Sequence, residues 1–240
     1  MADLFDIGKM GISAYKSALA TTGQNIANVD NDSYVRRDVK IEELTGSSAD
    51  ILSISNSSGL GVRIGDITRA FDKFLDIKLQ SSTSSFSFAK SKSEVFNQLE
   101  STLIPKNATV GTRLREFFDG LSNLAQDPDN ANLRRLALVN ANAVSTSISN
   151  LHTGLTDLRS VTHGTLELTI SEFNSTLKNL SQVQKEIMGN SAKTGAPHGL
   201  LDRRDALLEQ LSEIGDISVD YQASGGVTVS LGKLGAVGTL

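Results

Sequence analysis

The chain has 240 residues, with 23 Lys and Arg against 27 Asp and Glu, a formal net charge of −4, and no cysteine. The absence of cysteine excludes disulfide frameworks, thiolate zinc sites, iron–sulfur clusters and a thiol nucleophile. Aromatic residues are scarce, with 9 Phe, 3 Tyr and no Trp, and there are only 3 Pro. Together with long tracts rich in Ala, Leu, Ser, Asn and Gln, this composition predicts a mainly α-helical protein with long helices rather than a β-sandwich or barrel.

Charge and hydropathy also limit the classes of partner that the chain is expected to bind. No stripe of Lys and Arg is present, which speaks against nucleic-acid binding because phosphate contacts supply most of that affinity. No run of about 18 apolar residues occurs, so we expect no membrane insertion. Asp3 and Asp6 stand where a secretory signal carries cations, and no apolar stretch follows. We therefore expect no cleavable signal.

The first segment, residues 1–33, predicts a coiled-coil helix followed by a turn. Apolar and small residues recur there at alternating spacings of three and four, which is a heptad seam. The residues of this seam are Phe5, Gly8, Ile12, Tyr15, Leu19, Thr22, Ile26 and Val29. One seam cannot bury itself, so the helix needs a partner helix, either within this chain or in another subunit. Binding flat on a membrane is a further possibility, but the polar face carries few cations.

The next segment predicts two short strands and a helix. Val35, Val39 and Ile41 alternate with charged residues, and Leu60, Val62 and Ile64 alternate with Gly and Arg, as in half-exposed strands. A helix is expected over residues 67–103, with a break or bend at residues 80–87. The expected buried face of that helix consists of Phe71, Phe74, Ile77, Phe88, Val95 and Leu99.

The middle of the chain predicts an unusually long helix. A helix over residues 110–124 is followed by Asp127 and Pro128, a favoured order for capping a new helix. Heptad spacing then continues from Ala137 to Ile187 with one slip after Thr162. About 55 helical residues would form a rod of about 80 Å. The expected bundle core is Val144, Ile148, Leu151, Leu155, Leu158, Ile170, Phe173, Leu177 and Leu180.

After a Gly- and Pro-containing loop at residues 189–199, the sequence predicts a short helix over residues 200–214. Strands at residues 217–221 and 227–231 then form a hairpin. The expected fold is therefore a mainly α, long-helix coiled-coil or bundle rod with a small β-hairpin element, followed by the start of a β domain. Its expected parts are the N-terminal axial-core coiled-coil helix (1–33), the long-helix bundle with a small β-hairpin (34–214) and the truncated beginning of an outer β domain (215–240).

Candidate catalytic groups are few. His152 and His163 lie about 16 Å apart along one helix face, too far to share a metal ion. Asp205, Glu209 and Glu213 share a face beside two arginines, which favours a solvated charged face over an acid–base pair. The glycines of residues 59–65 do not match a phosphate-binding loop, and no Gly-x-Ser-x-Gly elbow occurs. We predict no catalytic residue, no metal site and no cofactor.

Residues 20–29 read Ala-Thr-Thr-Gly-Gln-Asn-Ile-Ala-Asn-Val, and Tyr34 follows. This stretch resembles the N-terminal signature of bacterial flagellar rod, hook and hook-associated proteins, and Asn25, Asn28 and Tyr34 match that signature. Residues 30–33 depart from its usual Asn-Thr-x-Gly-Tyr turn. Later blocks, in order, resemble the hook-associated protein 1 family: residues 61–75, 117–121, 127–128 and 200–207.

The resemblance implies a structural protein of the hook–filament junction rather than an enzyme. Such proteins are extracellular, are exported unfolded by the flagellar type III system without a cleaved signal, and assemble with copies of themselves. Hook protein lies on one side, and another hook-associated protein or the filament lies on the other. The N-terminal helix pairs with a C-terminal helix of the same chain, and an export chaperone binds the C-terminal region. Because no such C-terminal helix is present, we expect the 240 residues to be a fragment or partial chain.

Two other interpretations remain open. A hook or distal-rod protein of the same family is the nearest, although the long helix from Ala137 to Ile187 speaks against it. A helical secreted effector or enzyme would instead use Asp202, Asp205 and His198.

Overall fold

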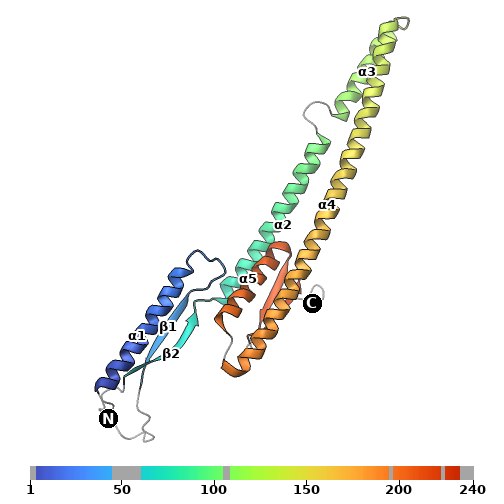
Figure 1. Ribbon diagram of the computed structural model, residues 1–240. Coiled ribbons are helices and arrows are strands. Elements are labelled where there is room, and N and C mark those ends of the chain that lie inside the picture. Colours follow the sequence, from blue (N-terminus) through green and yellow to red (C-terminus); the bar gives the residue numbers. More distant parts are fainter. Residues whose placement is uncertain (1–3, 45–60, 105–108, 195–196, 223–224, 233–240) are drawn as a thin grey trace. The chain divides into compact units, whose positions relative to one another are not determined.

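The computed structural model describes residues 4–44, 61–104, 109–194, 197–222 and 225–232. Figure 1 shows the elements in chain order, five helices and four strands within these residues. They are α1 (Leu4–Ala27), β1 (Arg37–Glu43), β2 (Val62–Arg69), α2 (Lys73–Leu103), α3 (Val110–Gln126), α4 (Ala131–Thr194), α5 (His198–Ile214), β3 (Ile217–Tyr221) and β4 (Val227–Leu231). The expectation of a mainly α fold with small β elements is confirmed. None of the helices in this part of the chain is both long and apolar enough to span a membrane.

The chain divides into two compact units. The first contains residues 1–82, 176–212 and 216–240, and the second contains residues 83–175 and 213–215. Helices α2, α4 and α5 therefore each contribute to both units. The three parts expected from the sequence have other boundaries and stay a prediction.

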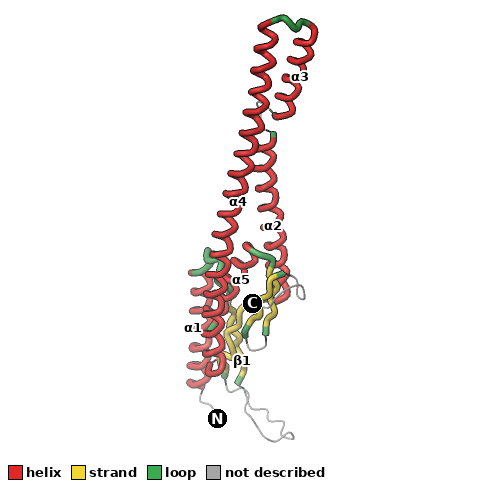
Figure 2. The backbone as a smooth tube through the Cα atoms, turned by 90° about the vertical axis from the view of Figure 1, so that its right-hand side faces the viewer, coloured by secondary structure: helices red, strands yellow, loops and turns green. Residues whose placement is uncertain are grey.

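In the first unit, α1 packs against an antiparallel hairpin of β1 and β2, as Figures 1 and 2 show. Arg37 lies opposite Arg69 in the register, and a bulge falls between Lys40 and Ile41. The two predicted strands are confirmed, but β2 extends to Arg69, where a helix was expected from residue 67. The helix starts later because the carboxylate of Asp72 accepts the backbone N–H groups of the first turn of α2, at 2.9 and 3.2 Å.

The apolar core of the first unit is formed by the C-terminal part of α4, by α5 and by the β3–β4 hairpin. Its buried apolar side chains are Leu180, Val183, Ile187, Leu208, Leu211, Ile217, Val219 and Val229. The hairpin predicted at residues 217–231 is confirmed, with Ile217 paired to Leu231, and it contributes to this core. The remainder of the expected outer β domain, residues 233–240, lies outside the described residues.

In the second unit, α3 and the N-terminal part of α4 approach closely. The side chain of Asn140 donates a hydrogen bond to the carbonyl of Glu116 at 2.9 Å. Gly120 is buried beneath it, and a Cβ at that position would lie 3.0 Å from the Asn140 amide nitrogen. Ala137 completes the contact with a small buried side chain. Close packing here depends on residues with little or no side chain.

The structure corrects several helix boundaries. Helix α2 is continuous, without the expected break at residues 80–87, and Phe74, Phe88 and Val95 on its expected buried face are exposed. Asp127 ends α3 instead of capping α4. Asn130 caps α4, because its side-chain oxygen accepts the N–H groups of Asn132 and Leu133. Helix α4 continues to Thr194, through the first part of the expected loop.

The expected core of the long helix is only partly buried within this chain. Leu180 is buried, whereas Ile148 and Ile170 are each 51% exposed. The other members are half-buried: Val144, Leu151, Leu155, Leu158, Phe173 and Leu177. A heptad seam becomes a core only where a second element covers it. Ile148 and Ile170 therefore do not belong to a core that this chain forms by itself.

Candidate assembly surface

Helix α1 packs on the β1–β2 hairpin through small side chains. Ala14 and Thr21 are buried on that face. Gly61, at the entry to β2, has a φ of +108°, and a Cβ there would lie 3.2 Å from the Met10 sulfur. Small residues on the helix and a glycine on the hairpin allow the two backbones to approach closely.

The predicted seam lies on the opposite face of α1. Ile12 and Ala14 are two positions apart, which is a rotation of about 200° around the helix axis. The six large apolar residues of the seam, Phe5, Ile12, Tyr15, Leu19, Ile26 and Val29, are between 68% and 81% exposed. Gly8 and Thr22, which complete the seam, are also exposed. No described residue of the chain covers this apolar strip, and such a strip typically marks an interaction site.

Two residues of the predicted signature join the end of α1 to the start of β1. The side-chain amide of Asn25 donates to the carbonyl of Arg37 at 2.9 Å, and its oxygen accepts the Arg37 N–H at 3.0 Å. The same oxygen accepts the hydroxyl of Tyr34 at 2.8 Å. Asn25 therefore pairs with Arg37 as a neighbouring strand would. These bonds fix the direction in which α1 leaves the hairpin.

Asn28, the third signature residue, belongs to the turn that follows. Its side chain donates to the carbonyl of Gln24 at 2.9 Å. The side-chain oxygen of Asn31 accepts the N–H of Ser33 at 3.2 Å, which is an Asx turn. Within the described residues no residue other than glycine has a positive φ. The unusual turn of residues 30–33 therefore closes through backbone and side-chain hydrogen bonds and needs no left-handed residue.

A cluster of charged side chains joins the hairpin to α5, and no sequence pattern predicted it. Arg69 lies 2.6 Å from one carboxylate oxygen of Asp205 and 2.8 Å from one of Asp202, and Arg37 lies 3.3 Å from the other oxygen of Asp202. Arg204 contacts Asp205 at 2.6 Å. We call these five residues the Arg–Asp cluster. The side chains of Arg69, Asp202, Arg204 and Asp205 are each no more than 10% exposed.

The Arg–Asp cluster corrects the expectation that Asp205 lies on a solvated charged face. Charged side chains are buried only when they are paired, and the partners of Asp205 and Asp202 include arginines from β1 and β2. More than 130 residues of sequence separate those partners. Helical periodicity within α5 cannot reveal so distant a partner.

A hydrogen-bonded pair of Asp76 and Tyr221 lies next to this cluster. The Tyr221 hydroxyl donates to Asp76 at 2.5 Å, and Arg204 stacks 5.0 Å from the Tyr221 ring centre. Burial is the main cause that raises the pKa of the Asp76 carboxyl, and the hydrogen bond from Tyr221 partly opposes it. Burial and the bond to Asp76 also raise the pKa of the Tyr221 phenol.

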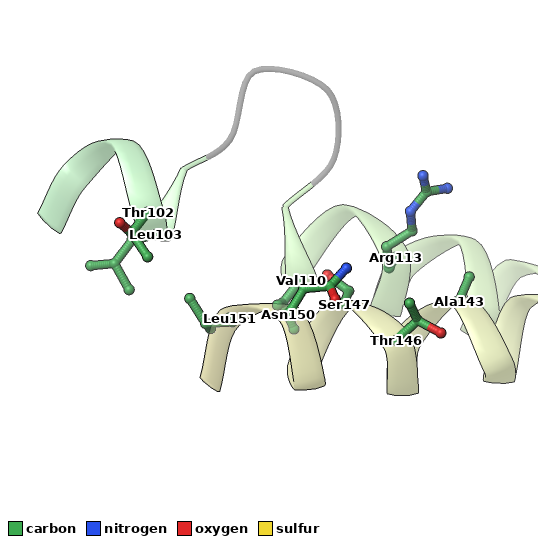
Figure 3. A pocket seen from close by; sticks show the side chains of 9 residues that line it. All are labelled: Thr102, Leu103, Val110, Arg113, Ala143, Thr146, Ser147, Asn150 and Leu151. Atoms are coloured by element: carbon green, nitrogen blue, oxygen red, sulfur yellow. The ribbon is translucent and has the colours of Figure 1, made fainter. Parts of the chain in front are cut away.

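The cavities offer little for catalysis. One cavity has a volume of about 530 Å³. It lies where the C-terminal end of α2 and the N-terminal end of α3 meet α4 (Figure 3). Among the described residues that line it, Arg113 is the charged one, and the others carry hydroxyl, amide or apolar side chains. Within the described ranges, no group of three or more His, Asp or Glu is placed to hold a metal ion. Of the residues that an enzyme would use, Asp202 and Asp205 are paired with arginines.

Comparisons with known proteins identify flagellar hook-associated proteins as relatives. The flagellar hook-associated protein 1 of Bacillus subtilis is 28% identical over 225 residues, which cover 92% of this chain and 44% of that protein. The Escherichia coli protein of the same name is 20% identical and is covered to 42%. The chain thus spans about two fifths of the length of these relatives. The fold is similar to that of the flagellar hook junction protein FlgK from Burkholderia pseudomallei, with a TM-score of 0.59, 23% identity, and coverage of 64% of this chain and 27% of the other.

Residues 96–237 match the family described as the flagellar hook-associated protein FlgK helical domain. The match includes the C-terminal part of α2 and all of α3, α4, α5 and the β3–β4 hairpin. Since it covers more than half of the 240 residues, the chain belongs to the family of the flagellar hook-associated protein FlgK helical domain.

Proposed function

We propose that this chain is part of a structural component of the bacterial flagellum that joins the hook to the filament, and that the seam of α1 is its subunit-packing surface. Family membership and the names of the relatives support the junction role. They favour it over a hook or distal-rod protein, and over an enzyme. The exposed seam is the observation that carries the packing surface.

In this proposal the seam is buried when the protein assembles. Covering apolar surface is worth about 25 cal/mol per Å², so six large exposed side chains supply a substantial driving force for helix packing. The face of α1 that carries Ala14 and Thr21 is already covered by the β1–β2 hairpin. A partner helix therefore packs on the opposite face, which carries the seam. The partners are copies of the same protein, hook protein on one side, and another hook-associated protein or the filament on the other. The protein reaches this extracellular site through the flagellar type III system without a cleaved signal, and an export chaperone binds its C-terminal region.

The test replaces seam residues without changing helix propensity. Leu19→Gln and the double variant Ile12→Gln/Leu19→Gln put polar side chains on the seam, and Gln is about as good a helix former as Leu. Each variant is introduced into the gene for this protein in its own bacterium. We expect impaired swimming and hooks without filaments in electron micrographs, and a larger defect for the double variant.

Leu168→Gln is the matched control. Leu168 on α4 is 75% exposed and Leu19 is 73% exposed, so the two substitutions change a similar exposed surface. The control should keep filaments attached. Normal filament attachment in the double variant would contradict the assignment of the seam as a packing surface, and so would an equal defect in the Leu168→Gln control.

A further inference from the structure

The first unit contains two parts that are packed in different ways. One part, which we call the arm, consists of α1, β1 and β2, and Ala14 is its buried apolar residue within the described ranges. The other part, which we call the body, consists of residues 176–194 of α4 together with α5, β3 and β4. The body holds the apolar core that includes Ile187, Leu208 and Leu211. The apolar side chains of the hairpin are only half-buried, so the arm adds little to that core.

The ion pairs of the Arg–Asp cluster join these two parts. Arg37 and Arg69 belong to the arm, and Asp202 and Asp205 belong to the body. Both arginines stand at the same end of the hairpin, where they are paired in the register. They therefore reach α5 together.

The Arg–Asp cluster is not fully hydrogen-bonded. The Arg69 Nε and the Asp202 Oδ1 are only 2.8 Å apart, but the N–H is not aligned for a hydrogen bond. The Nε of Arg37 is also buried without a hydrogen-bond partner. Arg69 donates a hydrogen bond to Asp205 and Arg37 donates one to Asp202, but the two Nε groups leave the cluster with fewer hydrogen bonds than its groups could make.

The chain leaves the arm at one place close to the cluster. Residues 70–72 have no regular structure and connect Arg69 to the start of α2. Immediately after them, the Lys73 ammonium donates to the carbonyl of Tyr221 at 3.0 Å, and Asp76 accepts from the Tyr221 hydroxyl. The start of α2 is thus fixed to the body independently of the ion pairs.

We propose that the Arg–Asp cluster is a latch that holds the arm on α5, and that its opening lets the arm turn about residues 70–72 while the body stays folded. Removing Arg69 deletes two of the three ion pairs by which the Arg–Asp cluster joins the arm to the body, and leaves the longer pair of Arg37 with Asp202. Because the arm takes little part in the core, opening exposes little apolar surface. The same protein can thereby present the α1 seam in more than one direction.

The absence of cysteine makes a direct distance measurement possible. Exposed residues Lys40 on β1 and Gln210 on α5 are replaced by cysteine and carry spin labels, and the distance between the labels is measured by pulsed electron paramagnetic resonance. In the parent chain we expect one narrow distance. In Arg69→Gln we expect a second population at longer distance, with unchanged helix content in circular dichroism.

Arg63→Gln is the matched control, because Arg63 lies in the same hairpin but pairs with Glu42 within the arm. It should keep the single narrow distance. A single unchanged distance in both Arg69→Gln and Arg37→Gln/Arg69→Gln would overturn the latch. A lower helix content of Arg69→Gln in circular dichroism would also overturn the latch, because the cluster would then be needed for the chain to fold. The measurement uses the isolated chain, so its failure leaves the proposed role of the seam untouched.

Discussion

Among single residues, Asp76 shows how burial of a charge makes stability depend on pH. Its carboxylate accepts hydrogen bonds from Tyr221 and, at 2.7 Å, from Gln80. These hydrogen bonds do not fully compensate the carboxylate for the hydration that it loses on burial. The pKa of Asp76 is therefore raised above its ordinary value of 3.8. The folded chain therefore binds this proton more tightly than the unfolded chain does. Stability consequently falls as pH rises from 3.8 through the raised pKa, and the loss is absent below 3.8.

We predict that Asp76→Asn removes this loss. Asparagine keeps a side-chain oxygen that accepts the Tyr221 hydroxyl, but it carries no charge at any pH. The melting temperature of the variant minus that of the parent should increase as pH rises through the window above 3.8. Asp38→Asn, at a carboxylate that is 56% exposed, is the control and should show a smaller change. A constant difference for Asp76→Asn across this window would refute the assigned cause.

For whole elements, the start of α4 depends on one side chain. Asn130 accepts the N–H groups of Asn132 at 3.0 Å and Leu133 at 3.4 Å, and these groups have no partner within the helix. Replacing such a cap by alanine costs about 0.5–2 kcal/mol. We predict that Asn130→Ala lowers the free energy of opening of the first turn of α4 by an amount in this range.

Site-resolved hydrogen exchange of the Asn132 and Leu133 amides measures that free energy. A global denaturation curve is less suitable because a chain of two units need not unfold in one step. Asp129→Ala is the control, since Asp129 is solvent-exposed and its ion pair is with Arg134. If exchange at Asn132 and Leu133 were equally fast in both variants, the cap would lie elsewhere.

These elements also show how far sequence patterns reach. Heptad spacing located the long helix because its signal is local and repeats over many turns. The four strands were predicted because the alternation of apolar and polar residues lies within a short stretch of chain, and the turn residues between the last two strands also predicted their hairpin. The cap of α4 was misplaced by three residues, since Asp127 and Asn130 are both good capping residues and only the turn between them decides. The Arg–Asp cluster was missed because Arg69 and Asp205 meet only in the folded chain.

Across the whole molecule, the two units differ in how much they bury. In the first unit, long apolar side chains such as Ile187, Leu208 and Leu211 are completely buried. In the second unit, the buried residues within the described ranges are the small ones Ser84, Gly120 and Ala137. Helical stability in proteins comes mainly from packing of an apolar face. The second unit should therefore open more readily than the first in the isolated chain.

We predict that amide hydrogens in residues 110–165 exchange faster than those in residues 204–212 and 216–219. Leu211→Ala removes a fully buried side chain and should cost about 2–5 kcal/mol, seen as faster exchange throughout α5 and β3. Ile148→Ala, at a residue that is 51% exposed, should cost much less. Equal costs for the two variants, or slower exchange in residues 110–165, would mean that the second unit is stabilised by more than its own buried side chains. Slower exchange at Ile148 only after assembly would instead show that neighbouring subunits supply the packing that the long helix lacks within one chain.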